Sequence, residues 1–325
     1  MRIVCDIHIP FIVEAIQKEW PQVDICPLKP EEIDASAVRN ADVLIVRTRT
    51  KVNETLLRNS KVQLVCTATI GFDHIDTAYC ESHNILWTSC PGCNAQAVCD
   101  YIEEALDTIT NNQSPIADTL TIGIVGVGHV GSKVAQMAKR KGYQVLLNDP
   151  PKGIGVSLDE SEGIEPFSGG KIADCDIITF HTPLNQSTYH LCNAAFLERC
   201  KPHALIINAA RGGVVDEQAL LQSKHPYILD TWENEPDIDL EVLKHAQLAS
   251  MHIAGYSAEG KRNASQMCLN AISRHFNLPE IVLPKDLSSL SNNGDSAPFW
   301  LSRITARLKE NPEDFELLRK NYPLR

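Results

Sequence analysis

The pattern that most constrains this chain is a short apolar run followed at once by three closely spaced glycines. Residues 121–125 (Thr-Ile-Gly-Ile-Val) have the composition of a buried strand, and the next six residues read Gly-Val-Gly-His-Val-Gly. Apolar residues then recur with helical spacing up to the basic residues 139–141, and Gly142 is placed to end the helix. A second apolar run, residues 143–147, precedes Asp149. Strand, glycines, helix, strand and acid in this order predict a dinucleotide-binding unit.

Each glycine in this unit has a physical reason. Gly126 permits a tight turn, Gly128 lets a pyrophosphate approach the backbone, and Gly131 lets the helix pack closely on the strand. The phosphates would lie on the helix N-terminus, where free N–H groups and the helix dipole favour anions. His129 and Val130 complete the loop and belong to the expected cofactor site, although His129 alone would equally suit a surface position at the helix start.

Asp149 predicts which dinucleotide is bound. It follows Gly131 by 18 residues, about the spacing of the carboxylate that binds the adenosine ribose in such units. A carboxylate there would repel a 2′-phosphate, so the sequence favours NAD over NADP.

The composition limits the other classes of function. A length of 325 residues suggests two domains, and 43% hydrophobic with 22% charged residues is typical of a soluble globular protein. The net charge of −11 argues against nucleic acid or an anionic membrane as partner. The chain begins with an expected strand and has no membrane-length apolar run, and its 11 scattered cysteines suggest reduced thiols in the cytoplasm. The C-x-x-C sequence at residues 90–93 has no matching second ligand pair, so no metal is expected.

The expected fold class is α/β. Residues 1–92 alternate short strands and helices, which predicts a smaller, flavodoxin-like substrate domain that residues 253–277 complete. Residues 93–252 are expected to form a doubly wound, parallel-sheet Rossmann domain. Residues 278–325 are expected to be a short C-terminal extension, with dimerisation as one role it could serve.

Polar residues follow the expected strands of the second domain. Because the carboxyl ends of parallel strands meet at one sheet edge, these side chains should converge although they span about a hundred residues. They are Asp149, Thr182, Arg211, Asp230, Glu235 and His252.

This set suits a nicotinamide dehydrogenase, which removes a hydroxyl proton as hydride leaves the adjacent carbon. His252 is the candidate base, because histidine titrates near neutrality, and Glu235 is the candidate that orients it. Arg211, followed by two glycines, could hold a substrate carboxylate. Glu233 competes with Glu235 for its role, whereas His181 is better explained as a strand-end residue than as the base.

Three cations follow the expected strand at residues 42–46: Arg47, Arg49 and Lys51. Two interpretations remain open, a solvated loop or a site for a phosphate or carboxylate. On charge alone, Arg47 and Lys51 are the expected phosphate partners.

The chain resembles the D-isomer-specific 2-hydroxyacid dehydrogenases over roughly residues 40–275. The residues that carry the resemblance are Gly126–Gly131, Asp149, 208–213, 230–236 and 252–255. Further stretches resemble the branch of that family that oxidises 4-phosphoerythronate: 46–53, 91–95, 148–151, 180–183, 252–261 and 317–325. The part after Asn277 is shorter than the C-terminal dimerisation domain of that branch, which leaves the dimer interface open.

The resemblance implies roles for individual residues. It implies Arg211, Glu235 and His252 as the catalytic set and Thr48, Thr69 and Tyr256 at the substrate. At NAD it implies, with the glycines, Asp149, Thr182, Ala209, Asp230 and Gly255.

The implied reaction oxidises 4-phospho-D-erythronate to (R)-3-hydroxy-2-oxo-4-phosphobutanoate, a step towards pyridoxal 5′-phosphate, in a cytoplasmic homodimer. The alternatives are a dehydrogenase for another D-2-hydroxy acid, such as phosphoglycerate or glycerate, and an NAD-sensing protein without turnover.

Overall fold

The structure is a computed structural model that describes residues 1–110, 120–154, 172–285 and 300–323. The chain divides into two compact units. The first unit comprises Met1–Asn94 and Ser257–Asn292, and the second comprises Ala95–Tyr256 and Asn293–Arg325.

The first unit is built on a parallel sheet of five strands in the order β2-β1-β3-β4-β5. This is the flavodoxin-like order. The strands are β1 (Arg2–Asp6), β2 (Asp24–Leu28), β3 (Val43–Val46), β4 (Leu64–Thr67) and β5 (Leu86–Thr88).

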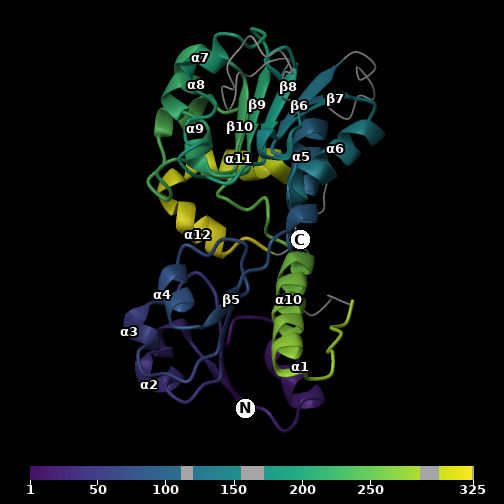
Figure 1. Ribbon diagram of the computed structural model, residues 1–325. Coiled ribbons are helices and arrows are strands. Elements are labelled where there is room, and N and C mark those ends of the chain that lie inside the picture. Colours follow the sequence, from purple (N-terminus) through teal and green to yellow (C-terminus); the bar gives the residue numbers. More distant parts are fainter. Residues whose placement is uncertain (111–119, 155–171, 286–299, 324–325) are drawn as a thin grey trace. The chain divides into compact units, whose positions relative to one another are not determined.

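Helices cover both faces of this sheet (Figure 1). On one face, α1 (Ile12–Glu19) and α10 (Ala258–Phe276) share a single apolar cluster with the strands. On the other face lie α2 (Ala35–Val38), α3 (Glu54–Leu57) and α4 (Thr77–Ser82). The strands β3 and β4 are buried along their whole length, as expected for parallel strands covered on both sides.

The second unit contains a parallel sheet of six strands in the order β11-β10-β9-β8-β6-β7. The strands are β6 (Thr121–Val125), β7 (Gln144–Asn148), β8 (Ile177–Phe180), β9 (Leu205–Asn208), β10 (Tyr227–Leu229) and β11 (Leu248–Ala249). The chain winds in opposite directions from β6, which pairs with β7 on one side and β8 on the other. In doubly wound sheets, ligands bind beyond the carboxyl ends of the strands at this switch point.

Helices again lie on both faces of the six-stranded sheet (Figure 1). One group is α5 (Ala95–Thr110) and α6 (His129–Arg140), and the other is α7 (Ala194–Leu197), α8 (Glu217–Ser223) and α9 (Leu240–His245). The α/β fold class predicted from the sequence, with one Rossmann and one flavodoxin-like sheet, is therefore confirmed.

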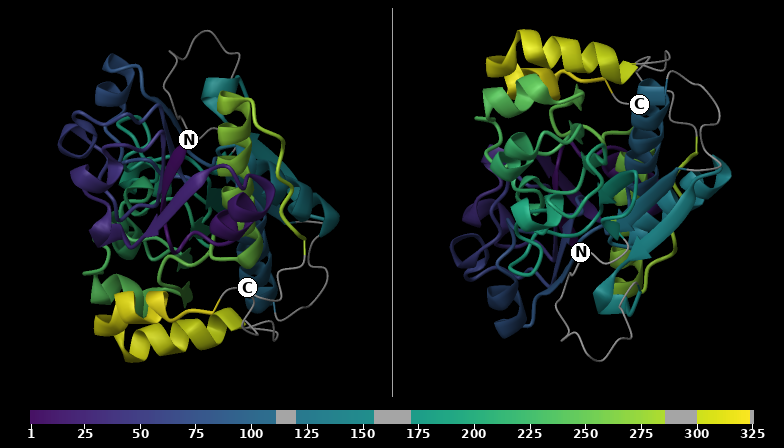
Figure 2. Two further views of the ribbon diagram at one scale, coloured as in Figure 1. Left: turned by 90° about the horizontal axis from the view of Figure 1, so that it is seen from below. Right: turned by 90° about the horizontal axis from the view of Figure 1, so that it is seen from above.

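The helices of the C-terminal extension pack on the second unit. The helices α11 (Trp300–Glu310) and α12 (Phe315–Lys320) contribute buried residues to the core of the second unit, among them Leu308 and Phe315. The backbone N–H of Ala249 in β11 donates to Thr305 Oγ1 at 2.9 Å. The helix α11 therefore covers the short edge strand β11, and Figure 2 shows both helices in yellow. A role for this segment in dimerisation stays a prediction.

The 11 cysteines are free, and most of them are buried. Within the described ranges, no helix is both long enough and apolar enough to cross a membrane.

Candidate active site

The glycine loop joins β6 to α6 at the switch point of the second sheet. Gly126 has φ +89°, and a Cβ there would lie 2.7 Å from the backbone oxygen of His181. A Cβ on Gly131 would lie 1.9 Å from the oxygen of Gly126, whereas Gly128 has open space. Two of the glycines are thus required by close packing, and the third leaves its backbone accessible. His129 is exposed at the helix start, and Val130 packs against the core.

Asp149 is tied to this loop. Its Oδ2 accepts a hydrogen bond from the N–H of Val127 at 2.9 Å and lies 3.5 Å from Lys152 Nζ. Lys152 also donates to the backbone oxygen of Val127 at 2.7 Å. The carboxylate that the sequence assigned to the ribose is therefore held at the glycine loop.

Two buried oxygens beside the loop have no hydrogen-bond partner within the described part of the chain. They are Asn148 Oδ1, at the end of β7, and Thr182 Oγ1, beyond the end of β8. Leaving a buried polar atom unpaired costs about 1–3 kcal/mol, so a polar group that bound here could satisfy both atoms. These two oxygens, together with the open space at Gly128, suit the phosphate and ribose of a dinucleotide. The loop therefore fits NAD.

The candidate base and its carboxylate partner are in direct contact. His252 Nδ1 lies 2.9 Å from Glu235 Oε2, and the N–H of Trp232 donates to Glu235 Oε1 at 2.9 Å. Burial favours a higher pKa for Glu235, but the hydrogen bond and charge of His252, aided by Arg319 of α12, hold that pKa below its usual value. In the tautomer that donates from Nδ1 to this carboxylate, Nε2 of His252 is the ring nitrogen not engaged by Glu235.

Asp230 fixes the segment that carries His252. Its Oδ1 accepts from Ser250 Oγ at 2.6 Å and from the N–H of Ile253 at 2.7 Å, and its Oδ2 accepts from the N–H of Ala254 at 2.9 Å. His252 itself has φ +57°, an unusual conformation for a residue with a side chain. The buried Asp230 therefore stabilises a strained turn at the base, and its expected contact with NAD stays a prediction.

Arg211 follows β9 and is exposed, with its Nη1 donating to the backbone oxygen of Ala210 at 2.7 Å. A Cβ on Gly212 would lie 1.9 Å from the backbone oxygen of Trp232. The loop of Arg211 thus lies directly against the turn that leads to Glu235. The second unit brings together Arg211, Glu235 and the segment of His252, while Asp149 and Thr182 lie at the glycine loop.

The two competing candidates have other partners. His181 Nε2 lies 3.1 Å from Thr179 Oγ1, and burial lowers the pKa of this histidine to about 3, so it stays neutral. Glu233 pairs with His190 rather than with His252, at 2.5 Å between Glu233 Oε1 and His190 Nε2. Ala209 and Gly255 are partly buried near the ends of β9 and β11, and Tyr256 packs against the core of the same unit.

The expected substrate residues of the first unit follow β3 and β4. Arg47 pairs with the fully buried Asp6, at 2.8 Å between Nε and Oδ2. Burial, followed by the charge of Arg47, lowers the pKa of Lys261 in α10. Two cations therefore lie within electrostatic range of each other, although Asp6 balances one of them.

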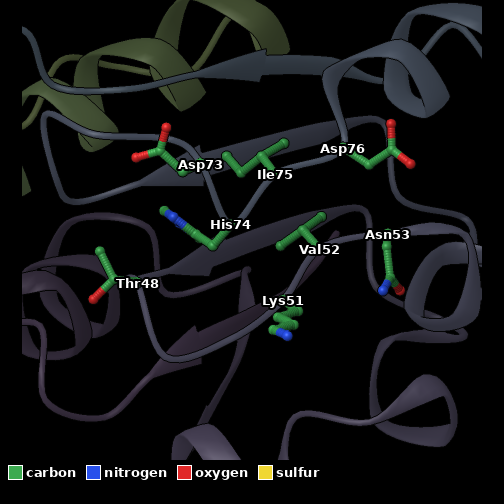
Figure 3. Close-up of a pocket in the computed structure, with 8 residues that line it drawn as sticks. All are labelled: Thr48, Lys51, Val52, Asn53, Asp73, His74, Ile75 and Asp76. Carbon is green, nitrogen blue, oxygen red and sulfur yellow. The ribbon is translucent and has the colours of Figure 1, made fainter. Parts of the chain in front are cut away.

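A pocket of about 520 Å³ opens beside the segment that follows β3 (Figure 3). Thr48 and Lys51 line it from one segment and His74 from another, together with Val52, Asn53, Asp73, Ile75 and Asp76. Thr69 is engaged nearby, since its hydroxyl donates to the oxygen of Gly71 at 2.8 Å and lies 2.6 Å from Thr67 Oγ1. Because Lys51 shares the pocket with two carboxylates, the pocket alone does not define an anion site.

Sequence reasoning missed four charged or titratable residues: His190, Asp216, Glu217 and Lys261. Asp216 and Glu217 follow Arg211 by five and six residues, and this short spacing was the available signal. Nothing in the sequence linked His190 to Glu233, which lies 43 residues further along the chain.

Comparison with known proteins shows the family of this chain. Residues 107–267 match the family model described as the D-isomer specific 2-hydroxyacid dehydrogenase, NAD binding domain. The chain is 43% identical to the erythronate-4-phosphate dehydrogenase of Bacteroides fragilis, in an alignment that covers the whole chain and 97% of that relative. It is 34% identical to the enzyme of the same name from Pseudomonas fluorescens, over the whole chain and 92% of that relative.

Solved structures show the same fold. A D-isomer specific 2-hydroxyacid dehydrogenase from Lactobacillus delbrueckii ssp. bulgaricus, in its NAD-complexed form, superposes with a TM-score of 0.67 at 22% identity. The superposition covers 87% of this chain and all of that one. The protein therefore belongs to the D-isomer specific 2-hydroxyacid dehydrogenases, and NAD is its cofactor.

Proposed function

We propose that this protein is an NAD-dependent dehydrogenase that oxidises 4-phospho-D-erythronate at C2 to (R)-3-hydroxy-2-oxo-4-phosphobutanoate. The observation that carries the proposal is the contact between His252 and Glu235 beside the Arg211 loop of an NAD-binding domain. The names of the relatives at 43% and 34% identity supply the substrate. The reaction would then be a step towards pyridoxal 5′-phosphate.

The side chains have distinct roles in this reaction. NAD held at the glycine loop would supply the acceptor for the hydride that leaves C2 of the substrate. His252 Nε2 takes the proton of the C2 hydroxyl, and the carboxylate of Glu235 stabilises the resulting imidazolium. Arg211 binds the substrate carboxylate, and its charge stabilises the oxygen on C2 as it becomes a carbonyl.

The phosphate of the substrate needs cations, and the first unit offers them. Arg47 and Lys261 are close enough for the charge of Arg47 to lower the pKa of Lys261, and a bound phosphate would relieve this repulsion. We assign them to the phosphate, with Lys51 as a further cation. Thr48, Thr69 and Tyr256 are proposed to bind the remainder of the substrate.

The proposal includes a cytoplasmic homodimer. Light scattering on the purified protein measures its mass in solution, and a value of one 36.0 kDa chain would contradict the dimer.

The test of the proposed function is absorbance at the NADH band with purified protein, NAD and a panel of 2-hydroxy acids. The panel holds 4-phosphoerythronate, 3-phosphoglycerate, glycerate and lactate, with a 2-oxo acid added in parallel as acceptor for NADH. Selective turnover of 4-phosphoerythronate is expected. Preference for another acid would refute the substrate but not the dehydrogenase activity, and NAD binding without any turnover would favour the sensing role.

A further inference from the structure

His190 connects two parts of the active site that lie on different loops. Its backbone N–H donates to the oxygen of Gly213 at 2.7 Å, in the loop that begins with Arg211. The ladder continues with Cys192 N–H donating to the oxygen of Val214 at 3.1 Å. The backbone of His190 is thus anchored to the Arg211 loop.

The side chain of His190 points to the other loop. Its Nε2 lies 2.5 Å from Glu233 Oε1, in the turn that ends at Glu235. Its Nδ1 lies 3.6 Å from Asp216 Oδ2, and the ring of Tyr189 stacks on it with centroids 3.9 Å apart. One ring nitrogen therefore contacts Glu233 directly, and the other faces Asp216 at slightly more than hydrogen-bond distance.

More negative charge lies behind this contact. The N–H of Glu233 donates to Glu217 Oε1 at 2.8 Å, and Glu217 is 3% exposed. Burial, and then the charges of Glu233, Asp239 and Glu235, raise the pKa of Glu217 to about 7 against the opposing effect of that hydrogen bond. Several carboxylates therefore surround the turn. The basic side chains that face these carboxylates are His190, His252 and Arg319.

We propose that His190 is a positioning residue of this active site, which ties the Arg211 loop to the Glu235 turn and offsets the carboxylates of Glu233 and Asp216. The proposal rests on the proposed dehydrogenase function. Replacing His190 with a side chain that cannot be protonated would leave these carboxylates without a basic partner, so the potential at the Glu235–His252 pair would become more negative. A more negative potential favours the protonated form of a nearby base, whereas oxidation of a hydroxyl needs an unprotonated one.

Two variants separate charge from packing. His190→Gln keeps one donor for Glu233 but removes the charge, and His190→Lys keeps a cation. The matched control is His245→Gln, because His245 is an exposed histidine of α9 with its own carboxylate neighbour, Glu241, at 4.0 Å. The measurements are kcat and KM from pH 5 to 9, and the Kd of NAD by calorimetry.

For His190→Gln, we expect kcat to fall roughly tenfold and the acid limb of the pH profile of kcat/KM to move up by about half a pH unit or more. The Kd of NAD should stay within about twofold of the wild-type value. His190→Lys should keep the limb near the wild-type position, and the control should match the wild type throughout. A purely structural role would lower kcat at every pH without moving the limb.

The inference is overturned if the limb of His190→Gln coincides with that of the wild type, or if His190→Lys shifts it as far as Gln does. A double variant with Glu233→Gln gives an independent readout by thermal unfolding. If the two side chains act as a pair, the double variant should lose no more stability than the worse single variant; additive losses would count against the contact. An inactive wild type would instead refute the proposed function.

Discussion

A single methyl group on Gly212 should separate the Arg211 loop from the Glu235 turn. In Gly212→Ala, the new Cβ would lie 1.9 Å from the backbone oxygen and 2.0 Å from the backbone carbon of Trp232, and 2.5 Å from the backbone nitrogen of Glu233. Real Cβ atoms essentially never approach other atoms closer than 3.0 Å. Since all three clashing atoms are backbone, no rotation of a side chain can relieve them, and the loops must move apart by about 1 Å.

The size of the effect follows from that displacement. Forcing an extra methyl group into a packed site typically costs about 1–3 kcal/mol of stability. A misplacement of about 1 Å between catalytic groups can lower the rate roughly 100-fold. Arg211 directly precedes Gly212, and Glu235 lies in the turn that the new methyl group would displace. We therefore expect both a loss of stability and a fall in the catalytic rate.

The assay is kcat/KM with NAD and the best hydroxy acid, together with thermal unfolding. Gly213→Ala is the matched control, because the atoms nearest to its Cβ would belong to side chains, the ring of Tyr189 at 3.2 Å and the end of Leu184 at 3.4 Å. Both of these side chains are exposed and can turn aside. Activity of Gly212→Ala within threefold of Gly213→Ala would refute the reasoning that the Arg211 loop and the Glu235 turn are held in contact here.

Four further variants test other parts of the structure. His252→Gln should lower kcat by about 10²–10⁴ while calorimetry shows unchanged NAD affinity, and retained turnover would rule out His252 as the base. Gly131→Ala, whose Cβ would meet the oxygen of Gly126 at 1.9 Å, should raise the Kd of NAD at least about tenfold, and an unchanged Kd would contradict the packed glycine loop. The contribution of Glu217 to stability should fall as pH rises from about 4.5 to about 7, because folded Glu217 binds its proton more tightly than the unfolded chain does. Urea unfolding of Glu217→Gln should lack most of this loss, which is at most about 3 kcal/mol. If the variant and the wild type showed the same pH dependence, the assignment of the loss to Glu217 would be refuted. Leu308→Ala, at a fully buried position of α11, should cost about 2–5 kcal/mol in the same assay, whereas a loss below about 0.5 kcal/mol would show that α11 does not belong to the core.

The local part of the fold was predictable from the sequence. The glycine pattern, the apolar strands on either side and Asp149 lie within about 30 residues, and each has a stereochemical requirement that a single segment can reveal. The catalytic candidates Arg211, Glu235 and His252 were accessible for a related reason. Each follows a strand, and parallel strands place their carboxyl ends along one edge.

The sequence did not indicate what the C-terminal helices pack against. Their apolar residues, such as Leu308 and Phe315, show that they pack against something, but periodicity does not say what. The short edge strand β11 and the bond from Ala249 to Thr305 show that they complete the second unit.

The sequence by itself determined the fold class, the cofactor and the residues that could act as base, acid and cation, because these depend on local patterns and on the chemistry of single side chains. Only the tertiary structure decided which charged residues meet. It paired Glu235 rather than Glu233 with His252, and it directed His190 to Glu233 and Asp230 to the turn of His252. These pairs join residues 17–43 positions apart, and electrostatic contacts depend on distances in space that spacing along the chain does not encode.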